Sequence, residues 1–311
     1  MESRSTARVE ALAGLPPKIS AVGWVRLWMR VALMVLVLIA LLPFHYFWRL
    51  LRLSSPWPRL FLGSVARIAG ARVHRAGVPL HRDVFYVANH LSWIDILAIA
   101  GTSGSAFVAK AELDDAPVVG WLARLNRTVF VSREDRLGVA DQINRLRDAL
   151  AENWAVTVFP EGTTTDGHSL LPFRTPLLQV LDPPPPGVMV QPVALDFHQA
   201  GREIAWIGLE SGKDNAIRVL SRPGSFEVTV EFLDPFLPAD FPGRKAIAAE
   251  SRRRIQLALE RRLGHPLEPY RTHDHITAEA RTALGLDPAE GAHGRMTRAA
   301  LRKAAQRGEE G

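Results

Sequence analysis

A histidine and an aspartate five residues apart are the first side chains in this sequence that could work together as a catalyst. They are His90 and Asp95 in the segment VANHLSWIDI, which begins in an apolar run typical of a strand. A carboxylate behind a histidine orients the imidazole and raises its basicity, so that the other ring nitrogen can take a proton from a hydroxyl. This spacing is common by chance and is weak evidence alone. A substrate alcohol would need no serine nucleophile, and we interpret Ser92 as a helix cap.

A second polar segment, FPEGTTTDG, follows the apolar run AVTV. Its proline and glycines suit a turn at the end of a strand, which requires no function. Glu161, Gly162 and Thr163 also suit a loop that binds a polar headgroup through side chains and backbone N–H groups. Arg133 follows another strand-like run and is placed to bind a phosphate or carboxylate, although an isolated exposed arginine usually has no such role.

The elements that must position these residues alternate between strand-like and helix-like patterns. Residues 136–153 place apolar side chains on one helical face. Strand-like runs rich in β-branched and aromatic residues occur at 84–88, 106–109, 128–131, 155–159, 188–190, 193–195, 204–207 and 226–232. This alternation predicts an α/β fold with a mostly parallel sheet flanked by helices and an active site beyond the carboxyl ends of strands. We expect the late strands near Trp206 and Phe226 to pair antiparallel at an edge.

An apolar segment near the amino terminus predicts a membrane-associating helical arm. Residues 31–48 hold no formal charge, and as a helix they would measure roughly 27 Å against a hydrocarbon core of about 30 Å. Four arginines flank the segment and are expected to reach lipid phosphates, namely Arg26, Arg30, Arg49 and Arg52. A full crossing, a shallow or re-entrant helix and a buried core helix all stay open.

Composition and boundaries narrow the classes further. We expect an arm at residues 1–55, a catalytic domain at 56–243 and a basic helix with a tail of unassigned function at 244–311. The helix at 244–263 either docks on the core or lies on a membrane surface. A net charge of +6 favours anionic partners, and the absence of cysteine excludes disulfides and cysteine nucleophiles. No GxGxxG or Walker motif is present, which disfavours dehydrogenases and kinases.

The order of the motifs resembles the glycerolipid (lysophospholipid) acyltransferase family, which includes 1-acylglycerol-3-phosphate acyltransferases. An Asn-His-x4-Asp block, a strand followed by arginine, Phe-Pro-Glu-Gly-Thr and Val-x-Pro-Val follow a hydrophobic arm across residues 25–235. The resemblance implies direct transfer of an acyl chain from a thioester to a lysolipid hydroxyl, without a covalent acyl-enzyme. It also implies that His90 is the general base and Asp95 its orienting partner. The residues it implies for the acceptor headgroup are Arg133, Glu161, Gly162 and Thr163.

One position departs from the family pattern. Many members that act on lysophosphatidate have Glu-Gly-Thr-Arg, whereas this chain has Thr164 in place of the arginine. Loss of a guanidinium weakens the case for a phosphomonoester acceptor. Bacterial enzymes that acylate lyso-ornithine lipid resemble this block and the Leu-Pro-Phe-Arg that ends at Arg174. Both acceptors therefore stay open, and Lys110 or Arg174 is a candidate for the missing charge.

The expected partners follow from the resemblance. They are a lipid bilayer, a lysolipid acceptor and an acyl donor, either acyl-CoA or acyl carrier protein, with no cofactor, metal or nucleic acid. We expect the inner membrane, with the catalytic domain facing the cytoplasm. Backbone amides near residues 89–91 or in the 162–165 loop are candidate oxyanion donors. The alternative is a noncatalytic membrane-anchored protein that binds anionic lipid.

Overall fold

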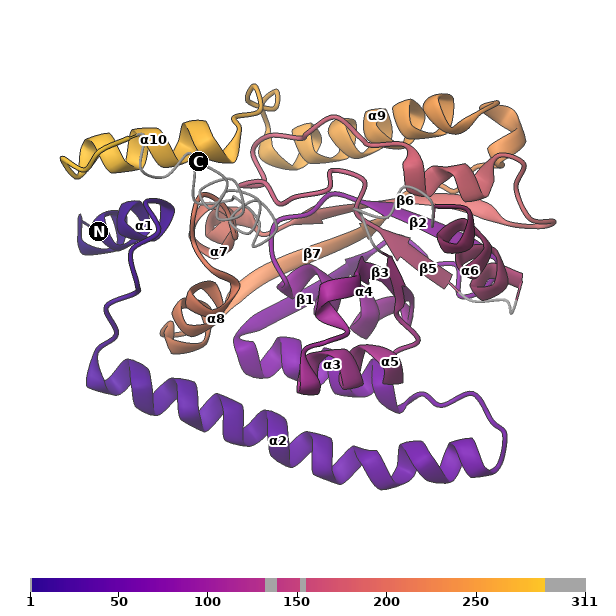
Figure 1. Ribbon diagram of the computed structural model, residues 1–311, viewed down its shortest axis with the longest axis horizontal. Helices are drawn as coiled ribbons and strands as arrows, with labels where there is room; N and C mark the ends of the chain where they lie inside the picture. Colours follow the sequence, from indigo (N-terminus) through magenta and orange to yellow (C-terminus); the bar gives the residue numbers. More distant parts are fainter. Residues whose placement is uncertain (1, 132–138, 152–154, 289–311) are drawn as a thin grey trace, which may run out of the picture.

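The computed structural model describes residues 2–131, 139–151 and 155–288, and within them the chain forms a seven-stranded sheet (Figure 1). The strand order is β1-β7-β6-β2-β5-β3-β4. The strands are β1 (Ala71–Ala76), β2 (Val84–Ala88), β3 (Ala106–Lys110), β4 (Val129–Val131), β5 (Ala155–Val158), β6 (Met189–Asp196) and β7 (Phe226–Phe232). Neighbouring strands pair in parallel except β6 and β7. The predicted α/β class with a mostly parallel sheet is confirmed.

The central strand β2 shows why the sheet needs helices on both faces. All five of its residues, VFYVA, are completely buried, as expected for a parallel strand covered on each side. Val84 and Tyr86 belong to one apolar cluster, while Phe85 and Val87 belong to a second on the opposite face. The first cluster includes side chains of α3 (Trp57–Ala69), α4 (Ile94–Ser103) and α8 (Gly212–Ser221). The second includes side chains of α6 (Val139–Ala151) and α9 (Arg244–Leu263).

The remaining helices lie around these layers. They are α1 (Glu2–Leu12), α2 (Ala21–Leu50), α5 (Pro117–Leu125), α7 (Gly201–Ile204) and α10 (His273–Ala283), with short 3-10 turns at Ala111–Leu113, Pro176–Leu181, His198–Ala200 and Pro238–Asp240. Helix α9 packs on the sheet side, where Ile255 and Leu259 are buried beside Ala194 of β6. It therefore docks on the core, one of the two alternatives left open for this basic helix. Helix α10, in the tail without an assigned role, packs against α1 (Figure 1).

The strand predicted at residues 204–207 is wrong, and so is the predicted edge position of the strand near Phe226. Residues 204–207 form the end of α7 and an irregular segment; they are apolar because they are buried, and burial alone does not distinguish a strand from a turn. Strand β1, with the sequence ARVHRA, lacks an apolar pattern because it is an edge strand that carries charged side chains. As a result β7, which pairs antiparallel with β6, lies inside the sheet rather than at its edge.

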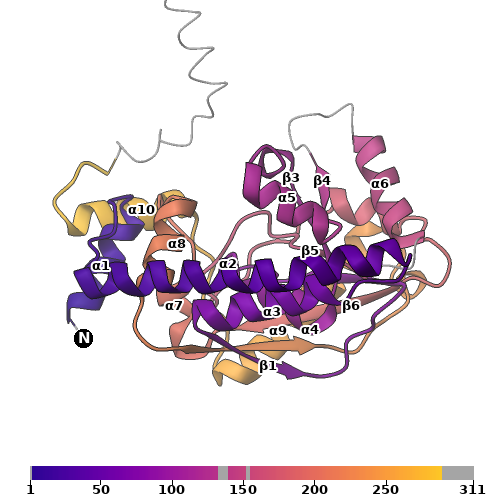
Figure 2. The ribbon, with the colours of Figure 1, turned by 90° about the horizontal axis from the view of Figure 1, so that it is seen from below.

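Helix α2 lies alongside the domain and is attached to it near both ends (Figure 2). Near its start, Arg30 is buried and donates hydrogen bonds to four carbonyls at the end of α8 and in the turn after it. Arg26 donates to the carbonyl of Ser221 at 2.6 Å. The negative end of the α8 dipole therefore takes these two guanidinium groups, and the expectation that they reach lipid phosphates is wrong.

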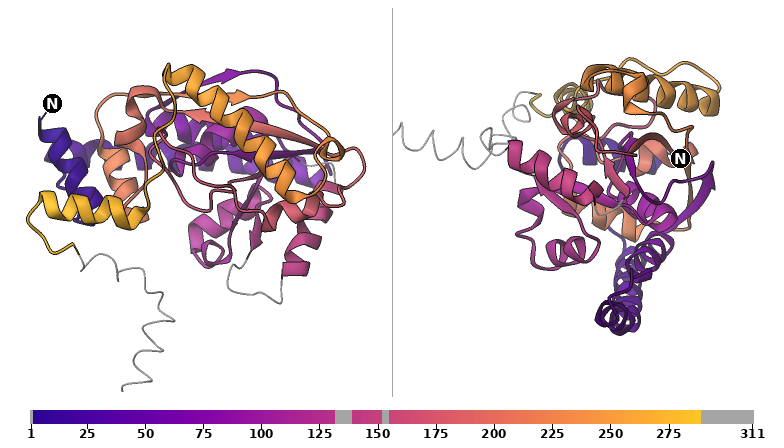
Figure 3. Two further views of the ribbon diagram at one scale, coloured as in Figure 1. Left: turned by 90° about the horizontal axis from the view of Figure 1, so that it is seen from above. Right: turned by 90° about the vertical axis from the view of Figure 1, so that its right-hand side faces the viewer.

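The second attachment lies near the end of α2. The rings of Phe44 and Trp48 pack on Trp57 of α3, with centroid distances of 5.0 and 5.5 Å. The Nδ1 atom of His45 lies 2.8 Å from the Ser55 hydroxyl. Between the attachments the helix is strongly apolar, with a mean hydropathy of 2.4 over its most apolar 18-residue window, of which 11% is buried. Figure 3 shows α2 on the side of the molecule opposite to α9.

Candidate active site

His90 and Asp95 form a hydrogen-bonded pair at the carboxyl end of β2. His90 comes two residues after the strand, and Asp95 is the second residue of α4, so the tight turn between them brings the two side chains together. The His90 Nδ1 atom lies 2.7 Å from Asp95 Oδ2. A carboxylate at Nδ1 favours the tautomer whose Nε2 can accept a proton. The predicted pair is therefore assembled in the geometry that a general base requires.

The backbone of the same turn fixes the Asp95 carboxylate. Its Oδ2 atom also accepts N–H bonds from Leu91 at 2.6 Å and from Ser92 at 2.9 Å. The side chain is completely buried, and Oδ1 has no partner among the described residues. Among the described residues, the Ser92 hydroxyl accepts a hydrogen bond only from the Ile94 amide, at 3.5 Å. Asp95, rather than the predicted Ser92 cap, therefore satisfies the free amides of this turn.

The imidazole of His90 is held between a packed face and an open nitrogen. Its ring stacks on Phe159, the residue after β5, with centroids 4.1 Å apart and planes 18° apart. The His90 side chain is 19% exposed to solvent. Its Nε2 atom is not buried and bonds to no described residue. The nitrogen opposite Asp95 is thus available to a substrate hydroxyl.

Glu161 ties the two predicted segments together. Its Oε1 atom accepts the backbone N–H of His90 at 2.8 Å, and its Oε2 atom accepts that of Leu171 at 3.0 Å. The side chain is 2% exposed. Burial raises the pKa of Glu161 to about 8, while the two N–H bonds act in the opposite direction. Both carboxyl oxygens face backbone amides, an arrangement that positions His90; contact with an acceptor headgroup stays a prediction for Glu161.

Two further residues of the predicted headgroup loop, Gly162 and Thr164, differ in their surroundings. The Thr164 hydroxyl, at the position of the missing arginine, is buried and donates to the Trp206 carbonyl. Gly162 has a φ of 76°, which glycine adopts without strain. A Cβ atom at residue 162 would lie 3.2 Å from the Cδ and Nε atoms of Arg174. The exposed Arg174 side chain therefore lies directly over this loop, whereas Thr164 turns away from solvent.

The structure leaves two predicted binding residues without side-chain evidence. Lys110 is the last residue of β3, at the same edge of the sheet as His90, but the structure does not describe its side chain. Arg133 lies outside the described residues. Both stay predictions.

Several residues that sequence reasoning missed hold these loops in register. The Asn89 amide exchanges two hydrogen bonds with the backbone of Leu195, at 2.7 and 3.0 Å, and so joins the ends of β2 and β6. The backbone of Trp206 donates to the Leu91 carbonyl and accepts the Thr164 hydroxyl. The Asn-His motif could have pointed to Asn89, because a side-chain amide at the end of a strand can hydrogen-bond the backbone of a neighbouring strand. Trp206 gave none, since its contribution is made by backbone atoms.

His273, the first residue of α10, reaches the same loop from the carboxyl-terminal region. Its Nε2 atom lies 2.8 Å from the Thr164 carbonyl and 3.4 Å from the Thr163 hydroxyl. The sequence offered no signal, because the two loops are more than a hundred residues apart. The tail without an assigned role therefore supplies a direct contact to the candidate headgroup loop.

The backbone amides around the site divide into used and free groups. Those of His90, Leu91 and Ser92 already donate to carboxylates, so they are not available to an oxyanion. In the 162–165 loop, the Thr165 amide donates to the His90 carbonyl. Within the described part of the chain, the amides of Thr163 and Thr164 have no acceptor. Of the candidate oxyanion donors in the 162–165 loop, where the Gly162 amide donates to the Phe159 carbonyl, these two stay open.

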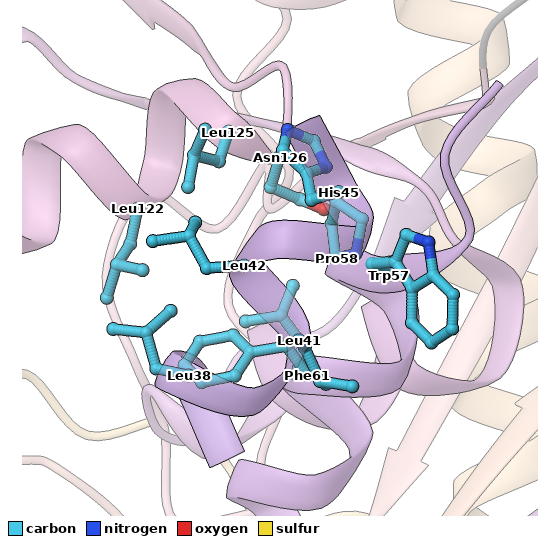
Figure 4. A pocket seen from close by; sticks show the side chains of 11 residues that line it. Leu38, Leu41, Leu42, His45, Trp57, Pro58, Phe61, Leu122, Leu125 and Asn126 are labelled. Carbon is cyan, nitrogen blue, oxygen red and sulfur yellow. The ribbon is translucent and has the colours of Figure 1, made fainter. Parts of the chain in front are cut away.

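A small apolar cavity lies away from the dyad, between α2, α3 and α5 (Figure 4). Its volume is about 30 Å³, and leucines of α2 and α5 form much of its lining together with His45 and Phe61. The nearby Asn126 donates to the carbonyl of Ser105, just before β3, which places the cavity toward the opposite edge of the sheet.

Among residues 2–131, 139–151 and 155–288, no group of three His, Asp or Glu side chains converges on a possible metal site.

Comparisons with known proteins agree with this geometry. A family model described as "Acyltransferase" matches residues 71–196. The lyso-ornithine lipid O-acyltransferase of Brucella abortus is 33% identical over 77% of this chain and 96% of that protein. The enzyme of the same name from Rhodobacter capsulatus is 34% identical over 75% of this chain and 89% of that protein. The 1-acyl-sn-glycerol-3-phosphate acyltransferase of Neisseria gonorrhoeae is 35% identical over 44% of this chain and 53% of that protein.

A solved structure supports the fold. The crystal structure of the 1-acyl-sn-glycerophosphate acyltransferase from Thermotoga maritima superposes with a TM-score of 0.57 at 22% identity, covering 77% of this chain and 95% of that one. The two lyso-ornithine lipid relatives cover about three quarters of the chain at more than 30% identity, and the family match includes both the dyad and the FPEG block. The chain therefore belongs to the glycerolipid (lysophospholipid) acyltransferase family and is an acyltransferase.

Proposed function

We propose that this protein transfers an acyl chain from a thioester donor to the free hydroxyl of a lysolipid, with His90 as general base. The observation that carries the proposal is the 2.7 Å contact between His90 and Asp95 with Nε2 left open. A binding protein has no need of such a pair. The relatives that cover most of the chain are named as enzymes that acylate a lysolipid.

The chemistry follows from the two ring nitrogens. Nε2 takes the proton of the lysolipid hydroxyl as its oxygen attacks the thioester carbonyl, and a tetrahedral intermediate forms. The carbon–sulfur bond then breaks, and the imidazolium returns its proton to the departing thiolate, giving an ester and a thiol. The Asp95 carboxylate stabilises the imidazolium between the two proton transfers. General-base assistance of this kind contributes roughly 10²–10⁴ to the rate.

The oxyanion of the intermediate needs donors that are free before the reaction. We assign this role to the amides of Thr163 and Thr164, because those of His90, Leu91 and Ser92 donate to carboxylates. A single well-placed donor is worth about 10²–10³ in rate. The Glu161 bonds to His90 and Leu171 fix the distance between this loop and the dyad.

The preferred acceptor in this proposal is lyso-ornithine lipid. Thr164 stands where an arginine would face a phosphomonoester, and its hydroxyl is bonded inward to Trp206. An amino-acid headgroup carries a carboxylate instead of a phosphate. The Arg174 guanidinium lies over Gly162 and has no carboxylate partner among the described residues, so it is free to bind that group. Three relatives that cover most of the chain carry this acceptor in their names.

The donor and the membrane complete the proposal. Acyl-CoA and acyl carrier protein both present a thioester and negative charge, which suit the net charge of +6. Helix α2 would lie in the plane of the inner membrane surface, with the catalytic domain on the cytoplasmic side. The same domain holds both of its end regions, an arrangement that favours a surface position over a full crossing.

The test is an acceptor comparison with the purified full chain in detergent. We expect transfer of an acyl chain to lyso-ornithine lipid with a kcat/KM at least tenfold above that for lysophosphatidate. His90→Ala should abolish both activities while the thermal unfolding profile is retained. Full activity in His90→Ala would refute the mechanism, and a preference for lysophosphatidate would refute the assignment of the acceptor. Arg174→Ala should raise the KM for lyso-ornithine lipid more than that for the donor.

A further inference from the structure

A second, larger hollow lies between α3, α4 and β1. Its volume is about 700 Å³, within the range of sites that hold a small molecule. The lining residues are Gly63, Arg67, Gly70, Ala71, Arg72, Val73, His74, Leu97, Ala98, Gly101, Thr102 and Ser225. None of them takes part in the catalytic pair, and neither the sequence motifs nor the comparisons assign this groove a role.

Small residues form much of the groove wall. The backbones of α3 and α4 touch at Gly63 and Gly101, where a Cβ atom on Gly101 would lie 2.7 Å from the Cα atom of Gly63. Ala71 and Ala98 add little bulk beside them. The missing Cβ atoms let the two helices pack closely, and this contact keeps the walls of the groove at a fixed separation.

Basic residues line the groove, whereas Glu227, which strand register places beside Arg72, does not line it. Arg67, Arg72 and His74 line it, no aspartate or glutamate does, and none of the three pairs with an acidic residue that the structure describes. Other arginines of the domain are paired, for example Arg218 with Glu210 and Arg262 with Glu231. Guanidinium groups left free in a concave site suit a phosphate ligand.

Strand register places the groove at the same edge of the sheet as His90. His74 of β1 is level with Thr229 of β7, which pairs with Asp196 at the carboxyl end of β6. Three strand spacings separate β1 from β2, or roughly 14 Å at about 4.8 Å per strand. A phosphate held here would lie well away from the His90 imidazole, on the same side of the molecule.

We propose that this groove binds phosphate groups of a ligand whose reactive or anchoring part lies elsewhere. In coenzyme A, a long pantetheine arm separates the thioester from the nucleotide phosphates, so the groove and the dyad would hold the two ends of one donor. This source rests on the proposed function. A phospholipid headgroup presents the same phosphate chemistry. It is the second possible source, because α2, the helix proposed to lie on the membrane, packs against α3, which forms one wall of the groove.

The experiment measures binding without catalysis. Coenzyme A and inorganic pyrophosphate are titrated calorimetrically into the purified full chain, and flotation with phosphatidylglycerol vesicles is measured in parallel. In the double variant Arg67→Ala, Arg72→Ala we expect affinity for phosphate ligands to fall at least about tenfold, since each charged hydrogen bond contributes roughly that factor. The matched control is Arg75→Ala, an exposed arginine of β1 that does not line the groove.

The outcomes separate the two phosphate sources and the two proposals. A loss of coenzyme A and pyrophosphate binding with vesicle binding retained supports the nucleotide source. A loss of vesicle binding with coenzyme A affinity retained supports the lipid source. If neither binding changes, or if Arg75→Ala has the same effect as the double variant, the groove is not a phosphate site. A chain that binds coenzyme A through the groove but transfers no acyl chain would instead refute the proposed function.

Discussion

The loops around the proposed catalytic pair and helix α2 differ in the kind of side chain that they expose and bury. At the carboxyl ends of the strands, buried polar groups are joined by short hydrogen bonds, and three of them converge on the single Oδ2 atom of Asp95. Along α2, large apolar side chains are left exposed, including Leu36 at 67% and Ile39 at 64%. The buried hydrogen bonds of the loops hold the reacting side chains in fixed positions. The exposed apolar face of α2 is costly to hydrate and suits contact with lipid or another apolar surface.

The two regions are expected to tolerate substitution differently. A buried polar network loses most when one partner is removed, because the others are left unpaired. On an exposed apolar face, each substitution removes contact area with lipid roughly in proportion to the side chain replaced, and the binding free energy falls accordingly. We therefore expect large effects on rate or stability from single changes at the loops, and graded effects on binding from changes along α2.

The largest effect is expected at Asp95. Asp95→Asn keeps the shape of the side chain but removes the charge that stabilises the imidazolium of His90. We expect kcat to fall by about 10²–10⁴ with little change in the acceptor KM. Steady-state kinetics with the purified enzyme measure the effect, and thermal unfolding confirms that the fold is retained.

A second histidine–aspartate pair provides the matched control. The Asp196 carboxylate lies 3.3 Å from the His198 Nδ1 atom, at the end of β6 and at the same edge of the sheet. Its histidine is bonded to the Thr229 hydroxyl of β7 at 2.9 Å. Asp196→Asn should leave kcat within about twofold of the wild-type value. Equal losses in the two variants would mean that the His90 pair has no special role.

The next effect is on stability and depends on pH. Burial raises the pKa of Glu161 from 4.5 to about 8, so the folded chain holds this proton more tightly than the unfolded chain does. Between those two pH values unfolding releases a proton, and the free energy of unfolding falls as pH rises, by up to about 1.4 kcal/mol per pH unit. Glu161→Gln cannot ionise and should flatten this slope in urea unfolding experiments.

The control for this titration is an exposed carboxylate. Glu227→Gln, on the solvent side of β7, should keep the wild-type slope. A slope that persists unchanged in Glu161→Gln would show that the buried carboxyl is ionised throughout this pH range. In that case a charged Glu161 side chain would position His90. Glu161→Gln would then be expected to lower kcat rather than to change how stability depends on pH.

Sequence reasoning reached the proposed catalytic pair because its two members lie close together in the chain. His90 and Asp95 belong to one turn, and a strand followed by a helix start is enough to bring them together. The central apolar strands were predictable for a similar reason, since burial on both faces demands a continuous apolar run. Strand β1 was missed because its partner β7 lies some 150 residues away and an edge strand needs no apolar pattern.

The supporting contacts were out of reach because they depend on tertiary structure. Glu161 was predicted as a headgroup ligand, yet its oxygens bind backbone amides whose positions no side-chain pattern encodes. Arg30 was expected at a lipid surface because its neighbours are apolar, and the end of α8 takes it instead. Residue type predicted which groups are costly to bury, but the fold decided which partner each one found.

A moderate effect is expected along α2. Leu36→Asp with Ile39→Asp places two charges on its exposed face and should reduce the fraction of protein bound to lipid vesicles by about tenfold. Flotation through a density gradient measures this fraction. The control is Leu257→Asp, which changes a half-exposed leucine of α9, and that helix lies on the opposite side of the molecule from α2 (Figure 3). Equal binding by all three proteins would mean that α2 does not face the bilayer.

The smallest effect is expected at His273, which joins the carboxyl-terminal helix to the loop beside the dyad. Its bonds to Thr164 and Thr163 hold the two amides that we assign to the oxyanion and the segment under Arg174. Loss of one such bond is worth about 0.5–1.5 kcal/mol, or roughly 2–10-fold.

His273→Ala should therefore raise the acceptor KM by a few fold and leave the donor KM unchanged, because the bonds act on the headgroup loop. His273→Gln retains a donor at a similar distance and should restore part of the loss. His275→Ala removes an exposed histidine of the same helix and serves as the control for a general loss of α10 packing. If donor and acceptor KM values rise together in His273→Ala, or if His275→Ala has the same effect, then α10 supports the fold as a whole and does not position the headgroup loop.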